Sequence, residues 1–122
     1  MPDRREPLIE CEFLIPKYRD AHFSDGTEHE QHSWEWLRTE LFDRFHGVTM
    51  APGFYTGYYQ DPDTGDPVAD QSLKFTVAIP QNRLAEFRGL LAAACVFFAQ
   101  KCIYLSVAGS VEFIEASDAT TE

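Results

Sequence analysis

The stretch that decides the fold runs from residue 72 to residue 98 and reads SLKFTVAIPQNRLAEFRGLLAAACVFF. Apolar side chains alternate with polar or small ones up to Ile79, which predicts a half-buried strand. Pro80 ends that strand, and Asn82 can cap a helix that follows at once. This helix, over about residues 82–101, has an apolar face made by Leu84, Phe87, Leu91, Ala94, Cys95 and Phe98.

A similar strand and helix lie upstream. Residues 8–15 alternate between apolar and polar side chains and predict a first strand that Pro16 ends. A second amphipathic helix is predicted over about residues 29–46, with Thr27 or Ser33 as its N-cap and Gly47 as a left-handed residue past its end. Its apolar stripe consists of Trp34, Leu37, Leu41 and Phe45.

Between the two units, residues 48–59 are rich in aromatic and β-branched side chains but are interrupted by proline and glycine. This pattern predicts a bent strand near a sheet edge, with one set of its side chains in the core. The turn formers of residues 61–67 predict a solvent-exposed hairpin. Residues 103–107 predict the closing strand, and Gly109 either kinks it or turns it into a short hairpin with residues 111–114.

The resulting order, β-α-β-β-α-β, predicts an α+β fold of the ferredoxin-like type, with two helices on one face of a four-stranded antiparallel sheet. At 122 residues the chain fits one domain spanning residues 1–122, with an ordered core over about 8–115 and frayed polar ends. The loop over residues 16–27 is long enough to be a candidate functional loop.

The charge balance limits the classes of partner. Twenty acidic against ten basic side chains give a formal net charge of −10, and the basic residues are scattered along the chain. Such a field repels phosphate backbones and anionic lipids, so we expect no nucleic-acid and no membrane partner. The charged first residues and the absence of a long apolar run favour a cytoplasmic protein.

A search for known catalytic motifs provides little evidence for an enzymatic function. Phosphate-binding glycine loops, a nucleophile elbow and a C-x-x-C pair are all absent from the sequence. Cys11, Cys95 and Cys102 lie in or beside apolar stretches, which favours buried thiols over a nucleophile because apolar surroundings raise a thiol pKa. No cofactor is predicted.

Four histidines are the candidate acid–base or metal-binding groups. His29 and His32 could share one face of the first helical turn and, with His22 upstream, hold a divalent cation. Exposed polar side chains at a helix start explain the same pattern without a metal, and this interpretation is favoured. His46 is a weak candidate for a general base, although its simpler role is to stabilise the C-terminal end of the helix.

Tyrosines mark a candidate ligand or interface surface. Alternate residues of a strand emerge on opposite faces, so one set of side chains could line the sheet face that the helices leave uncovered. Rings with polar tips suit a small ligand or a second subunit. The residues predicted for this surface are Tyr55, Tyr58, Thr76 and Tyr104.

Several short segments carry a resemblance to a known group. They are Phe45-His46-Gly47-Val48-Thr49, Asp61-Pro62-Asp63-Thr64-Gly65, Gln100-Lys101-Cys102-Ile103-Tyr104 and Val111-Glu112-Phe113-Ile114. Over about residues 30–115 the chain resembles a group of small uncharacterised bacterial proteins with a ferredoxin-like fold. The resemblance implies that fold and brings no catalytic residues.

Three functions remain open at this point. The leading hypothesis is a non-enzymatic binding, regulatory or oligomerising module that uses the uncovered sheet face, with a homo-oligomer or a small-molecule ligand as its partner. The alternative is a small dimeric ferredoxin-like enzyme with a histidine as acid–base residue. An acidic protein that mimics nucleic acid ranks last, because the acids form no regular array.

Overall fold

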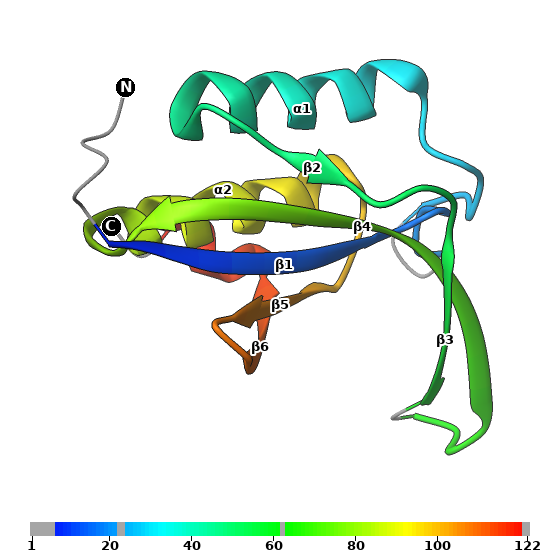
Figure 1. The fold of residues 1–122 in the computed structure, drawn as a ribbon. Helices are drawn as coiled ribbons and strands as arrows, with labels where there is room; N and C mark the ends of the chain where they lie inside the picture. The colour runs from blue at the N-terminus through cyan, green and yellow to red at the C-terminus, as the bar shows by residue number, and fades with distance from the viewer. Residues whose placement is uncertain (1–6, 22–23, 62, 121–122) are drawn as a thin grey trace.

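The computed structural model describes residues 7–21, 24–61 and 63–120. Figure 1 shows two helices above a twisted sheet, with a long hairpin descending from one end of it. In chain order the elements are β1 (Leu8–Pro16), α1 (Gln31–Phe45), β2 (Thr49–Met50), β3 (Tyr55–Gln60), β4 (Pro67–Pro80), the 3-10 turn η1 (Gln81–Arg83), α2 (Leu84–Phe97), β5 (Cys102–Val107), β6 (Ser110–Glu115) and the 3-10 turn η2 (Ala116–Thr120).

The strands form one antiparallel sheet in the order β2-β4-β1-β5-β6, and β3 also pairs with β4. This order confirms the predicted ferredoxin-like α+β arrangement, in which β1 lies between the strands that precede and follow α2. The sheet has six strands instead of four. One reason is that residues 103–114 form the β5–β6 hairpin, and the other is that the bent second strand is divided into β2 and β3 near Gly53, whose φ is 74°.

The core lies between the sheet and the two helices. Phe13 of β1 and Phe75 of β4 stack with ring centroids 5.0 Å apart, and Phe87 of α2 meets Phe13 edge to face at 5.9 Å. Leu37 and Leu41 of α1 are fully buried against this cluster. Burial of such side chains contributes about 1.5–3 kcal/mol each to folding, which fixes the helices to one face of the sheet.

The ends of α1 differ from the prediction. Its N-cap is Glu30, which makes no side-chain capping bond, instead of Thr27 or Ser33. His46, with φ 67°, is the left-handed residue, and its N–H donates a hydrogen bond to the carbonyl of Phe42. The chain reverses one residue before Gly47, so the C-terminal carbonyls are satisfied without requiring glycine.

The β3–β4 hairpin extends beyond the helices, and we call its outer part, residues 55–71, the arm. Figure 1 shows it bending to the side of the sheet opposite α1. Every residue of β3 is exposed, so the expectation that one face of this strand enters the core was wrong. The physical reason is that neither α1 nor α2 extends over the arm (Figure 1). At its tip, the Asp61 carboxylate accepts hydrogen bonds from the backbone N–H groups of Asp63 and Thr64, at 2.8 and 3.3 Å.

Within the described residues, no helix is both long enough and apolar enough to cross a membrane.

Candidate functional site

The uncovered face of the sheet carries a charged pair at its centre. Phe13 and Phe75 are buried under the helices, so the alternating neighbours Glu12 and Lys74 project to the other side. The strand register places Glu12 opposite Thr76, and Lys74 opposite Leu14. Lys74 Nζ lies 3.2 Å from Glu12 Oε2, and each side chain retains about a third of its exposure, at 31% and 35%. This pair is therefore fixed by the sheet but remains accessible.

Three of the four residues predicted for this surface surround the pair. Thr76 Oγ1 donates a 3.5 Å hydrogen bond to Glu12, and Lys74 Nζ lies 5.4 Å from the centroid of the Tyr55 ring. Tyr104 is on the same face, because Leu14 pairs with both Lys74 and Tyr104 in the register. The hydrogen bond to Glu12 is the largest of the effects that raise the pKa of Lys74. The ammonium group stays charged at neutral pH.

Tyr58 is separated from this group. In the register Tyr55 pairs with Ser72 and Tyr58 with Ala69, which places the two tyrosines on opposite faces of the arm. Tyr58 is 78% exposed and points away from the Glu12–Lys74 pair. Its place on the surface thus differs from that of the other three predicted residues.

A second group of polar side chains lies where the arm joins the sheet. Burial, followed by the charge of Asp20, raises the pKa of the Asp70 carboxyl, which also accepts a hydrogen bond from the backbone of Gln71. Burial raises the pKa of Tyr59, and the neighbouring charges of Asp70 and Asp20 raise it further. Asp70 is at an even-numbered position of β4, as Lys74 is, so both side chains belong to the uncovered face.

Sequence reasoning missed Glu12, Lys74, Tyr59 and Asp70. A signal for Glu12 and Lys74 was present, since each occupies a polar position in an alternating strand. What the sequence could not give was the pairing of these two strands in that register. For Asp70 no local signal existed, because its raised pKa arises from tertiary burial.

The histidines do not form a common site. The Nε2–H of His29 donates a 2.8 Å hydrogen bond to the carbonyl of Pro16, and its ring packs edge to face against Trp34 and Phe98. His32 is exposed and lies 3.2 Å from Glu30. The prediction for His22 falls outside the described residues. Among residues 7–21, 24–61 and 63–120, no three His, Cys, Asp or Glu side chains gather as a group that could hold a metal ion.

His46 is exposed at the C-terminal end of α1, in the helical layer. Burial raises the pKa of the Cys11 thiol to about 11 and that of Cys95 to about 12, which fits the prediction of unreactive thiols. Burial also raises the pKa of Cys102. Cys11 precedes Glu12 on β1 but is fully buried on the helical face, whereas Cys102 lies two residues before Tyr104 on β5 and so belongs to the uncovered face.

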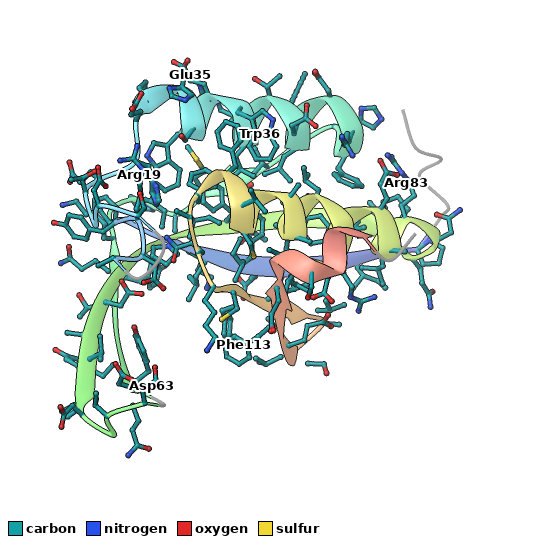
Figure 2. All side chains as sticks on the ribbon, turned by 180° about the vertical axis from the view of Figure 1, so that it is seen from behind. Arg19, Glu35, Trp36, Asp63, Arg83 and Phe113 are labelled. Carbon is teal, nitrogen blue, oxygen red and sulfur yellow. The ribbon has the colours of Figure 1, made fainter. Side chains whose placement is uncertain are left out.

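The helical side of the molecule carries a broad, shallow groove of about 680 Å³ across α2. Four of its charged lining residues form two ion pairs: Arg88 binds both carboxylate oxygens of Glu112 at 2.8 and 3.0 Å, and Arg44 lies 2.8 Å from Glu40. In Figure 2, Trp36 marks the helical layer, while Phe113 and Asp63 lie on the far side of the sheet. Because both of its arginines are engaged by carboxylates, this groove is a weaker candidate for a ligand than the uncovered face.

No protein-family model matches the sequence, and no curated protein sequence does either. The resemblance to small bacterial proteins therefore extends only to the fold. Among solved structures, the chain is similar to a phage SAM lyase in complex with S-methyl-5′-thioadenosine, with a TM-score of 0.68 and 12% sequence identity, over 96% of both chains. A phage SAM lyase in the apo state matches with a TM-score of 0.53 and 11% identity, over 92% of this chain and 90% of that chain.

The fold is SAM lyase-like. This finding corrects the leading functional hypothesis, because the structural neighbours are enzymes and not non-enzymatic binding or oligomerising modules. The alternative, a small ferredoxin-like enzyme, agrees better with the comparison. The non-enzymatic hypothesis was wrong because the sequence of an uncovered sheet face does not show whether that face binds a ligand, forms an assembly or catalyses a reaction.

Proposed function

We propose that this protein binds S-adenosylmethionine (SAM) and cleaves it to S-methyl-5′-thioadenosine (MTA). The observation that carries the proposal is the match over 96% of both chains to a phage SAM lyase with MTA bound. Since a shared fold does not by itself transfer an activity, the chemistry of the uncovered face is the second support. That face combines carboxylates, aromatic rings and one ammonium group.

The charges of this face suit a sulfonium substrate. SAM carries a positive sulfur, which aromatic faces and carboxylates attract. Tyr59 and Asp70 offer such groups together, with Asp20 close enough to influence both. The formal net charge of −10 also draws a cationic small molecule toward the protein.

Formation of MTA breaks the bond between the sulfur and the γ-carbon of the methionine-derived chain. The bonding electrons stay on sulfur, which becomes a neutral thioether. The carbon fragment must then be neutralised by loss of a proton to a base or by bonding to a nucleophile within the substrate. Asp70 is the candidate base, because a carboxyl with a raised pKa holds an abstracted proton better than an ordinary one. His46 is not assigned this role, since it lies at the helix end.

The test is to incubate the purified full chain with SAM and to measure MTA by liquid chromatography and mass spectrometry. We expect MTA to accumulate with the wild type and to fall about 10²-fold with Asp70→Asn, the loss that removal of a general base typically causes. Asp63→Asn is the matched control, because Figure 2 shows Asp63 at the far tip of the arm. Its rate should equal that of the wild type.

Absence of both MTA formation and SAM binding in the wild type would contradict the proposal. Equal rates for Asp70→Asn and wild type would remove Asp70 from the mechanism without removing the activity.

The predicted homo-oligomer also remains a proposal. It is supported by exposed apolar side chains at two separate places, the helical side and strand β6. On the helical side these are Phe42, Val96 and Phe97, and on β6 they are Val111 and Phe113. Surfaces of this kind are commonly buried against another subunit.

A further inference from the structure

The Glu12–Lys74 pair differs from the two bidentate arginine pairs, Arg83–Glu86 and Arg88–Glu112, in how its bonding capacity is used. Arg83 and Arg88 each bind both oxygens of one carboxylate, which leaves those oxygens occupied. Lys74 contacts Glu12 through one oxygen, Oε2, and an ammonium has three N–H donors. The Glu12–Lys74 pair therefore retains both donors and acceptors that face solvent on the uncovered sheet.

The free α-amino acid group is the chemical complement of such a pair, because it carries an ammonium and a carboxylate on one carbon atom. A fixed carboxylate beside a fixed ammonium can bind both, each through a charge-assisted hydrogen bond. A ligand with only one charge would be attracted by one member of the pair and repelled by the like charge of the other. The pair thus selects a zwitterion over a simple anion or cation.

We propose that the pair formed by Glu12 and Lys74 recognises the amino-acid end of SAM, with Glu12 binding the α-ammonium and Lys74 the α-carboxylate. The inference rests on the proposed function and goes further by assigning the substrate end that each region binds. Asp70 lies four residues from Lys74 on β4, a separation of about 13 Å along a strand. Because the sulfonium is only three bonds from the α-carbon, an extended SAM molecule held by the pair has its sulfonium between the pair and Asp70 and its adenosine toward Tyr59.

Two sequence-distant neighbours hold the pair in place. Thr76 donates a hydrogen bond to Glu12, and the Tyr55 ring lies beside the Lys74 ammonium. Both contacts restrict long, flexible side chains before any ligand arrives, and this reduces the entropy cost of binding.

The experiment compares two probes by isothermal titration calorimetry on the full chain. S-adenosylhomocysteine contains the adenosine and the amino-acid end, whereas MTA lacks the amino-acid end. We expect Lys74→Met and Glu12→Gln each to weaken binding of S-adenosylhomocysteine about 10-fold or more, because a charged hydrogen bond is lost. Binding of MTA should stay within about twofold of the wild type in both variants.

Arg88→Met is the matched control, because it removes another half-buried ion pair, with Glu112, on the helical side. It should change neither affinity. The charge swap Glu12→Lys with Lys74→Glu keeps an ion pair across the same two strands, so it serves if a single variant fails to fold. We expect the swap to bind S-adenosylhomocysteine more tightly than either single variant.

An equal loss of affinity for both probes in the single variants would overturn the inference, because it would show that the pair only maintains the shape of the face. Unchanged affinity for S-adenosylhomocysteine would overturn it as well. If the wild type binds neither probe and does not cleave SAM, the proposed function itself fails. If the wild type binds both probes and the ratio of the two affinities is the same in the variants, this inference fails while the proposed function stands.

Discussion

At the scale of single residues, His29 shows how burial changes the role of a polar side chain. The sequence suggested a metal ligand on an exposed helical turn, but the ring is only 8% exposed and lies between Trp34 and Phe98. Burial is the main cause of the lowered pKa of His29, and the charge of Arg19 lowers it further. Through its hydrogen bond to Pro16, the ring ties the segment that precedes α1 to the end of β1.

This environment predicts a pH-dependent stability. The unfolded chain binds a proton at His29 near pH 6.5, whereas the folded chain binds it only at lower pH. The stabilisation is therefore complete above about pH 6.5 and is lost as the pH falls below that value. We expect the unfolding free energy from urea titrations to fall more between pH 7.5 and pH 5 in the wild type than in His29→Gln.

His32→Gln is the control for this prediction, since His32 is exposed and lies beside the exposed Glu30. Its pH dependence should follow the wild type. If the unfolding free energy changed equally with pH in wild type and His29→Gln, burial would not govern the titration of His29.

At the scale of elements, the arm carries Tyr59 and Asp70 outside the folding core. Phe75, Val77 and Ile79 of β4 are buried under the helices, whereas the outer half of the strand pairs only with β3. Thr56 and Gln71 are register partners across the hairpin. A short turn can therefore replace everything beyond them without changing the strand register.

We predict that replacing residues 57–70 by Asn-Gly gives a folded protein without the proposed SAM-cleaving activity, because Tyr59 and Asp70 are removed and the core is kept. Cooperative thermal unfolding by circular dichroism and the MTA assay are the two measurements. The control replaces only the tip, residues 61–66, by Asn-Gly between the paired Gln60 and Pro67. This variant should stay active, and full activity in the longer deletion would place the site elsewhere.

At the scale of the whole molecule, charge and exposed apolar surface oppose each other. A formal net charge of −10 on each chain makes like chains repel, while Val96 and Phe113, at 68% and 60% exposure, favour contact. Salt screens the repulsion, with a Debye length of about 10 Å at 0.1 M. We expect multi-angle light scattering to give a mass that is a multiple of 13.9 kDa and an association that strengthens with added salt.

Two variants locate the interface in the same experiment. Phe113→Glu introduces a charge on β6, and Val96→Glu introduces one on the helical side. The variant on the true interface should lower the mass, and the other should leave it unchanged. A monomer at every salt concentration would contradict the predicted homo-oligomer.

The strands, helices and hairpin turn were largely predictable from the sequence, because hydrophobic periodicity, Pro80 and the turn over residues 61–67 act on neighbouring residues. Departures occur where tertiary context outweighs local preference. His46 adopts the left-handed conformation before Gly47, and β3 stays exposed although its aromatic residues favour burial.

The candidate site was predictable only in part, for a different reason. Periodicity placed Tyr55, Thr76 and Tyr104 on the uncovered face, where the register does gather them around one ion pair. Glu12 and Thr76 are 64 positions apart in sequence, and no local pattern encodes which strands pair.

The sequence by itself determined the order of the elements and the excess of acidic over basic side chains, since both follow from local spacing and composition. Only the tertiary structure decided that Glu12 meets Lys74, that the half-buried Asp70 raises the pKa of Tyr59, and that His29 lies among aromatic rings. These features depend on long-range strand pairing and on desolvation, which exist only once the chain is folded.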